Sequence, residues 1–240
     1  MKTRRSIPEI DLANIATIED RTKKRAALER LKLGHPPFSY APMRRCILDI
    51  LNISPGPLAP GFRAPWETIA GEIVRRCRSD EEIAANLRAA EGLYRYGDRL
   101  ALTGRQHEFF AMPLGVFAKV SYWSPLIIAI DGKATVPFFD PRRTKKLTER
   151  GRQFAFSVMH ERIRAADPDF AEVALAIYQF ENTNEGMRPP KPHFDDGVPL
   201  FGFHDLAEMT RDTYELWRDV LDERDEEVRR RAGGMKGDLL

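Results

Sequence analysis

The chain has 240 residues, of which 42% are hydrophobic, so it can bury a sizeable core in one large domain. Lys and Arg number 38 against 36 Asp and Glu, and this small net charge does not indicate nucleic-acid binding without a local cluster of bases. No run of about 18 apolar residues is present, and the two cysteines lie too far apart for a CxxC metal site. We therefore expect a soluble, cytoplasmic, bacterial-type protein without a disulfide framework.

Basic residues gather near the start of the chain, where we expect a helical arm over residues 1–53. Residues 1–35 hold nine Lys or Arg against five acids, with few apolar positions, and this pattern predicts one short helix. Such a segment is either a solvated helix packed lightly on the body or an arm that contacts phosphates. Residues 54–65 contain four prolines and two glycines, which predicts a linker.

Two helices are predicted after this linker. Pro65 suits the first turn of a helix over 66–78, whose apolar positions include Ile69 and Ile73. The sequence SDEE at 79–82 supplies an N-cap and first-turn acids for a second helix, which we expect to end near Gly97.

The pattern then changes to strands. Residues 114–140 are rich in β-branched and aromatic residues, and Asp131 with Gly132 predicts an antiparallel hairpin turn between two of these strands. Thr144 is the predicted N-cap of a helix that extends to about residue 166. Residues 172–180 form a continuous apolar run, which predicts a further buried strand.

The remainder of the chain is a polar segment followed by a helix. Residues 181–197 predict a long loop, and residues 204–231 predict an amphipathic helix that carries Leu206, Met209, Leu216 and Trp217 on one stripe. We thus expect an α/β (α+β) protein with an αβββαβ core and a mixed sheet. Its predicted parts are the arm (1–53), the linker (54–65), the core (66–203) and the C-terminal helix and tail (204–240).

The element order over residues 80–180 resembles the PD-(D/E)XK, or restriction-endonuclease-like, nuclease superfamily. The motif falls on DPR, with Asp140 as the metal carboxylate and Arg142 in the place of the usual lysine. Gln153 resembles a glutamine found after the motif in some branches, and Glu161 is a nearby acid that could complete the site. The resemblance implies a metal-dependent nuclease, if the chain is an enzyme, with Mg²⁺ or Mn²⁺ held by Asp140; otherwise we expect no cofactor.

The same residues also have a structural interpretation. Arginine stays protonated and cannot share a proton with an attacking water, and no second acid occurs on the preceding predicted strand. Asp140 could instead pair with Arg142 or Arg143, with Pro141 fixing the turn. The nucleophile-elbow, dinucleotide and P-loop motifs are all missing from the sequence.

Two functional hypotheses follow. The first is a nucleic-acid-associated protein for DNA processing or defence, with a nuclease-like core and a phosphate-binding patch at Arg142, Arg143, Lys145 and Lys146. The second is a non-catalytic subunit that binds a partner protein through the C-terminal helix. An exposed apolar stripe on that helix would favour the second hypothesis. Neither hypothesis involves a membrane.

Overall fold

A computed structural model of the chain describes residues 6–31, 39–53, 63–115, 118–183 and 186–234. None of the described helices is both long enough and apolar enough to cross a membrane. The α-helices are α1 (Glu9–Ala16), α2 (Arg21–Glu29), α3 (Ala41–Arg45), α4 (Ile47–Ile50), α5 (Trp66–Arg76), α6 (Asp80–Arg99), α7 (Glu149–Met159) and α8 (Phe203–Gly234). The strands are β1 (Thr103–Gln106), β2 (Met112–Leu114), β3 (Ala118–Val120), β4 (Leu126–Ile130), β5 (Lys133–Asp140), β6 (Ala174–Phe180) and β7 (Pro190–Phe194).

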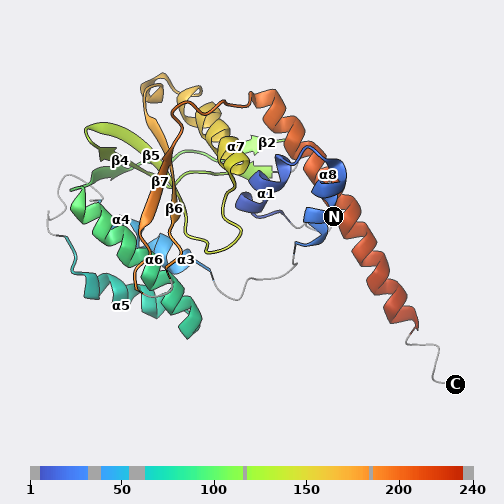
Figure 1. Cartoon of the computed structure of the whole chain (residues 1–240), viewed down its shortest axis with the longest axis horizontal. Helices are drawn as coiled ribbons and strands as arrows, with labels where there is room; N and C mark the ends of the chain where they lie inside the picture. Colours follow the sequence, from blue (N-terminus) through green and yellow to red (C-terminus); the bar gives the residue numbers. More distant parts are fainter. Residues whose placement is uncertain (1–5, 32–38, 54–62, 116–117, 184–185, 235–240) are drawn as a thin grey trace.

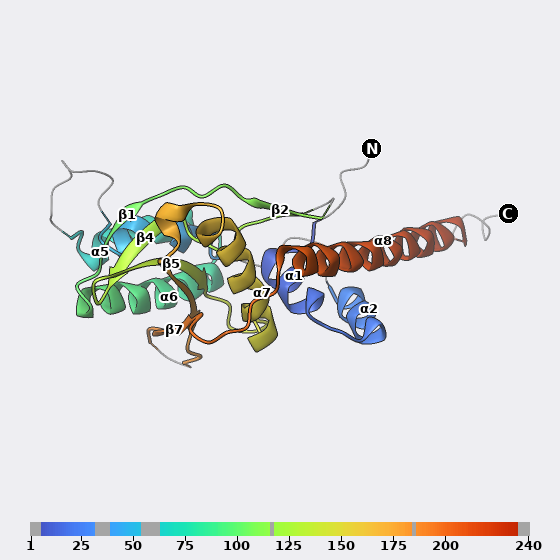
Figure 2. The ribbon, with the colours of Figure 1, turned by 90° about the horizontal axis from the view of Figure 1, so that it is seen from above.

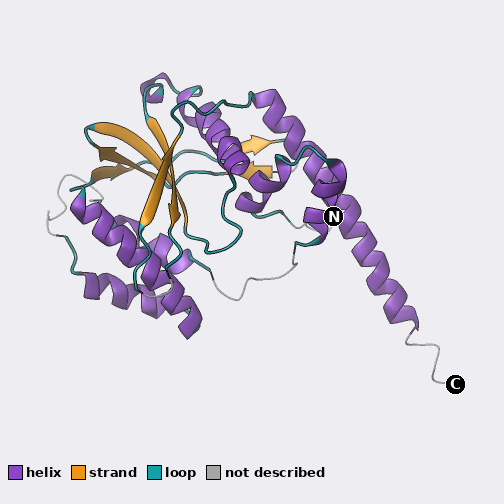
Figure 3. Cartoon of the chain, in the orientation of Figure 1, coloured by secondary structure: helices purple, strands orange, loops and turns teal. Residues whose placement is uncertain are grey.

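A five-stranded mixed sheet in the order β1-β4-β5-β6-β7 forms the centre of the fold (Figure 3). The β4–β5 hairpin turns at Asp131 and Gly132, both with positive φ, which confirms the predicted turn. Strand β6 runs parallel to β5, and β7 is antiparallel to β6. The order of α6, three sheet strands, α7 and β6 therefore confirms the predicted αβββαβ core with a mixed sheet.

The two faces of the sheet bury separate apolar clusters. Neighbouring residues alternate between them, so that Phe138 belongs to one cluster and Phe139 to the other. Along β6, Leu175 and Ile177 alternate with Ala176 in the same way. This period of two is what a strand buried on both faces requires. Helices α3–α6 cover one face of the sheet, and α7 lies over the other, on the side of α1 and α8 (Figure 1).

Helices α5 and α6 confirm the predicted helix pair. The hydroxyl of Ser79 accepts a hydrogen bond from the Glu82 N–H, as expected of an N-cap, but α6 continues past Gly97 to Arg99. Gly97 therefore does not end the helix. The linker expected at 54–65 lies mostly outside the described residues.

Helix α8 is the long C-terminal helix that the sequence predicts, and its distal end projects beyond the body (Figure 2). The apolar side chains of this helix, however, pack in the core of the protein. Leu206 is 0% exposed, and Leu216 and Trp217 are 3% exposed, in one cluster with residues of α1, α2 and β2. The stripe is thus not a free surface for a partner, so the condition that would favour the second hypothesis is not met. Binding of a partner through other faces of α8 stays a prediction.

Other boundaries differ from the prediction because local contacts decide them. Helix α7 starts at residue 149, with Thr148 rather than Thr144 as its N-cap, and continues into a π-helical turn, η1 (His160–Arg164). Strands β2 and β3 form a separate two-stranded sheet, while β1 supplies the first strand of the main sheet. The loop expected at 181–197 contains β7, whose two prolines sit on an edge strand, where a missing N–H is tolerated.

Candidate functional site

Asp140 ends β5 and is completely buried, at 0% exposure. Its carboxylate accepts hydrogen bonds from the Leu147 N–H at 2.9 Å, the Arg142 N–H at 3.3 Å and the Gln179 side-chain amide at 3.3 Å. A buried carboxylate needs such donors because it has lost its water. These bonds close the loop from residue 140 to residue 147. The expected pairing of Asp140 with the side chain of Arg142 or Arg143 is not among them, because Arg142 contacts Asp140 through its backbone N–H and pairs its guanidinium with Asp11.

Arg188 stabilises the same loop by hydrogen bonds to its carbonyl oxygens. It is 1% exposed and donates to the carbonyl oxygens of Pro141 at 2.7 Å and Arg142 at 3.2 Å. It also donates to the Glu181 carbonyl at 3.0 Å, the Phe180 carbonyl at 3.4 Å and the Tyr40 hydroxyl at 3.2 Å. Burial lowers the pKa of Arg188, yet the surrounding oxygens satisfy its guanidinium. No motif or spacing in the sequence indicates this role of Arg188.

The four bases of the expected phosphate-binding patch divide into two pairs. Arg142 forms an ion pair with Asp11 at 3.2 Å, and Lys146 donates to the carbonyl of Phe180. Arg143 and Lys145 are exposed. Only the second pair has its side chains directed to solvent, so a role of this patch in nucleic-acid binding rests on those two residues and stays a prediction.

The remaining predicted residues lie on and after α7. The side-chain amide of Gln153 donates to the Pro199 carbonyl at 2.9 Å, which ties α7 to the segment before α8. Glu161 lies half-buried in η1. Within the described ranges, no group of three or more His, Cys, Asp or Glu side chains could hold a metal ion. The structure thus places Asp140, Arg142 and Lys146 in one loop. Among the hydrogen bonds of the described residues, none joins Asp140 to Gln153 or Glu161.

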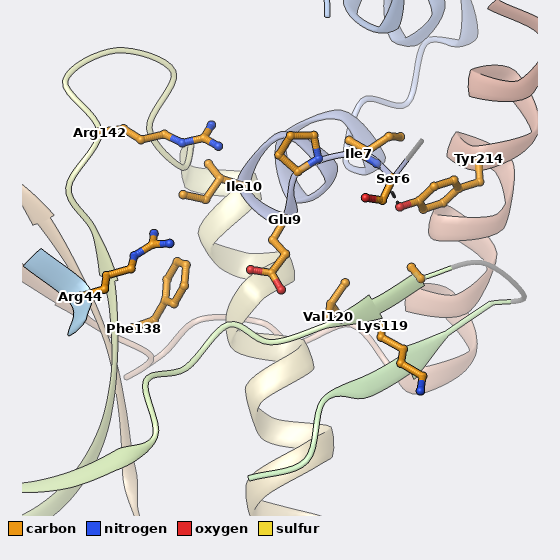
Figure 4. Close-up of a pocket in the computed structure, with 12 residues that line it drawn as sticks. Ser6, Ile7, Glu9, Ile10, Arg44, Lys119, Val120, Phe138, Arg142 and Tyr214 are labelled. Atoms are coloured by element: carbon orange, nitrogen blue, oxygen red, sulfur yellow. Dashed lines mark hydrogen bonds between the residues drawn. The ribbon is translucent and has the colours of Figure 1, made fainter. Parts of the chain in front are cut away.

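A pocket of about 400 Å³ lies between α1, α3, β3, β5 and α8 (Figure 4). Glu9 lines it and accepts a hydrogen bond from the Ser121 N–H at 3.1 Å, while burial raises the pKa of its carboxyl group. Arg44 lines it as well, and burial lowers the pKa of its guanidinium, against the attraction of Glu9. Lys119 and Arg142 add further positive charge to the wall. The pocket can therefore accommodate polar or charged groups.

A second feature that the sequence analysis missed is the extended segment between β1 and β2. It covers residues 107–111 and carries Phe110, which is 80% exposed. The neighbouring Phe109 turns inward and contacts the rings of Phe170 and Trp123, at centroid distances of 5.2 and 6.5 Å. Two consecutive phenylalanines among polar residues are the signal that could have found this segment, because neighbours in an extended chain point to opposite sides.

Comparison with known proteins gives a consistent result along almost the whole chain. Residues 10–227 match the family described as "Sliding clamp-binding bacterial toxin SocB". The chain is 33% identical over 228 residues to the DNA replication inhibitor toxin SocB of Caulobacter vibrioides (strain NA1000 / CB15N), covering 95% of this chain and 95% of that protein. No solved structure matches.

These matches correct the resemblance to the PD-(D/E)XK nucleases. That assignment, with its nuclease-like and restriction-endonuclease-like descriptions, is wrong, because the family match covers the core in which the nuclease motif was sought. An αβββαβ order is shared by proteins of different function and does not identify a nuclease. The chain belongs to the family of SocB, the sliding clamp-binding bacterial toxins.

Proposed function

We propose that this protein is a toxin that binds the bacterial sliding clamp and thereby inhibits DNA replication. The observation that carries the proposal is the 33% identity to the replication inhibitor toxin SocB over 95% of both chains. A match of this extent includes both faces of the sheet and most of α8. The proposal corresponds to the second of the two hypotheses drawn from the sequence, a protein that acts by binding another protein.

The geometry around Asp140 agrees with action by binding. The carboxylate is buried and engaged by three donors, and the described residues contain no metal-binding cluster. A protein that acts by occupying its partner works stoichiometrically. Its effect should therefore depend on the ratio of the toxin to the clamp, and added clamp should relieve it.

The direct test is to measure binding of the purified protein to a purified bacterial sliding clamp by calorimetry or surface plasmon resonance. We expect a dissociation constant of about 1 µM or tighter, which corresponds to about 8 kcal/mol of binding free energy. A Lys145→Ala variant, altered at an exposed position, is the matched control and should bind equally well. Absence of binding at clamp concentrations well above this range would refute the proposal.

A functional test uses primer extension with a polymerase that depends on the clamp. The protein should slow extension in proportion to its ratio to the clamp, and excess clamp should restore the rate. Extension by a polymerase that works without a clamp should be unaffected. Equal inhibition of both reactions, or degradation of the template, would indicate action on DNA rather than on the clamp.

A further inference from the structure

We infer that the pocket between α1, α3, β3, β5 and α8 binds a small phosphate monoester, whose phosphate group pairs with Arg44 and Arg142 (Figure 4). This ligand site goes beyond the proposed function and does not depend on it. The pocket has a volume of about 400 Å³, near the lower end of the range of about 300–1,000 Å³ in which proteins hold small molecules. The site therefore fits a small phosphorylated molecule rather than a nucleic-acid strand.

The first observation is a guanidinium that has no partner in the described part of the protein. Arg44 lies in the last turn of α3, and among the described residues no hydrogen bond or ion pair joins its side chain to another group. The side chain is accessible to solvent, yet enough protein surrounds it that burial lowers the pKa of the guanidinium. Arginine stays protonated and presents five N–H donors in a planar fork. Arg44 therefore offers a charge and donors to a ligand.

Arg142 supplies further donors to the same space. Its Nη1 donates to the Asp11 carboxylate at 3.2 Å and to the Lys145 carbonyl at 3.5 Å, so the described residues leave its Nε and Nη2 unused. Figure 4 shows the guanidinium groups of Arg44 and Arg142 on one side of the pocket, both directed toward α1. Besides burial, repulsion by Arg142 lowers the pKa of Arg44. An anion between the two groups would relieve this repulsion and accept hydrogen bonds from both.

The charge of the lining distinguishes a phosphate from a carboxylate. The lining residues carry three positive charges, on Arg44, Arg142 and Lys119, against one carboxyl group, on Glu9. A phosphate monoester carries about 1.5 to 2 negative charges at neutral pH. It therefore matches the excess of positive charge more closely than the single charge of a carboxylate, and its oxygens suit the fork of an arginine.

Apolar side chains form much of the remaining lining and indicate that the ligand has an organic body. Ile7, Ile10, Val120 and Phe138 line the pocket beside the charged groups. Inorganic phosphate gains nothing from apolar surface, whereas the carbon atoms of an ester can cover that surface and remove it from water. A monoester is therefore favoured over the free ion.

Contacts between distant parts of the chain hold the walls of the pocket in place. The Ile7 N–H donates to the Tyr214 hydroxyl at 3.3 Å, and the Tyr122 hydroxyl donates to the Glu9 carbonyl at 2.6 Å. The Ser121 N–H donates to the Glu9 carboxylate at 3.1 Å. Because these walls are ordered without a ligand, binding loses less entropy.

Another hollow, between α2 and α8, is unsuited to an anion. Of its two bases, Lys24 pairs with Asp212 at 2.7 Å, and Arg211 lies 4.0 Å from Glu208. Four acidic side chains line it, those of Asp205, Glu208, Asp212 and Glu215. A phosphate would be repelled there, so the expected site is the pocket beside Arg44.

Calorimetry on the full chain tests the inference at about pH 8, where a phosphate monoester is a dianion. The probes are ribose 5-phosphate and adenosine 5′-monophosphate, with inorganic phosphate and adenosine as comparison ligands. We expect at least one monoester to bind with a dissociation constant of about 100 µM or tighter, and both comparison ligands to bind at least about tenfold more weakly. The same monoester should raise the melting temperature.

Three variants locate the site. Arg44→Gln should weaken monoester binding by about tenfold or more, because it removes a charge and the donor fork. Arg45→Gln is the matched control, since Arg45 is the exposed neighbour outside the lining, and it should change binding by less than about twofold. Glu9→Gln should tighten binding by about twofold or more, because it removes a negative charge and keeps an acceptor for the Ser121 N–H. Circular dichroism should be unchanged in all three.

Each contrary outcome overturns the inference. Binding of neither monoester at about 1 mM would do so, as would binding of inorganic phosphate or adenosine as tightly as the monoesters. Equal losses in Arg44→Gln and Arg45→Gln would point to net charge rather than to the pocket. If Arg44→Gln does not fold, Glu9→Gln decides, and an unchanged or weaker affinity in that variant refutes the assignment. None of these results bears on the proposed function, because clamp binding is measured separately.

Discussion

Replacement of Arg188 by methionine should destabilise the protein strongly. Methionine keeps much of the aliphatic length but removes every donor of the guanidinium. The carbonyls of Pro141, Arg142 and Glu181 would each lose a hydrogen bond at 2.7 to 3.2 Å in a site that excludes water. Because Arg188 also contacts Tyr40, the change would separate the segment before α3 from the ends of β5 and β6.

The expected magnitude follows from these contacts. A hydrogen bond that involves a charged group contributes about 1.5–3 kcal/mol, but bonds from one guanidinium are not additive. The transfer of methionine into the site also avoids the cost of burying a charge, which offsets part of the loss. We therefore expect a decrease of about 3 kcal/mol in the free energy of unfolding. For a chain of this size, this corresponds to a fall of about 6–12 °C in melting temperature.

Urea denaturation monitored by circular dichroism measures this decrease, with scanning calorimetry for the melting temperature. Arg143→Met is the matched control, because Arg143 lies on the same loop but is exposed, and it should change the free energy of unfolding by less than about 0.5 kcal/mol. A loss below about 1 kcal/mol in Arg188→Met would show that the loop does not depend on the guanidinium. The reasoning about this network would then be refuted.

Three further predictions concern other parts of the molecule. Gly92→Ala should lower the free energy of unfolding by about 3 kcal/mol, because the added Cβ would overlap a backbone carbonyl of the segment before β7. Gly71→Ala has open space around the added Cβ and should raise the free energy of unfolding by about 0.5–1 kcal/mol. Urea denaturation measures both changes, and equal values for the two variants would contradict the prediction. Burial raises the pKa of Glu9 in the folded state, so its contribution to stability is present below pH 4.5 and is lost as the pH rises through the folded-state pKa. Glu9→Gln should therefore flatten the fall in stability above pH 4.5, and an unchanged profile would count against the assigned cause. If the patch binds nucleic acid, alanine at Arg143 and Lys145 should weaken binding and reduce its salt dependence, and an identical salt slope would exclude these two bases.

Much of the fold could be predicted from the sequence, because its signals are local. The turn at Asp131 and Gly132, the N-cap at Ser79 and the apolar run of β6 each depend on residues that are neighbours in the chain. Strand β1 could not be found in this way. Its sequence, TGRQ, is polar and exposed, and it becomes a strand only because β4 pairs with it.

The contacts of the candidate site and of α8 were harder to predict, because they join residues that are far apart in the chain. The acceptors of Arg188 come from positions 40, 141, 142, 180 and 181, which no spacing rule connects. The stripe on α8 has the periodicity of a docking helix, but the same periodicity arises when a helix packs on its own core. Phe110 shows the converse. Its exposure depends on Phe109 occupying the inward position, which only the three-dimensional contacts reveal.

Asp140 illustrates why an element order shared with nucleases need not bring their chemistry. A Mg²⁺ site needs carboxylate oxygens that are free to coordinate and open to water, because this ion keeps several of its own waters. Here the carboxylate is 0% exposed, and donors from Arg142, Leu147 and Gln179 occupy it. Coordination would require those bonds to break in a buried site, with the loop from 140 to 147 released. The bonds that close this loop thus explain the aspartate at the end of β5.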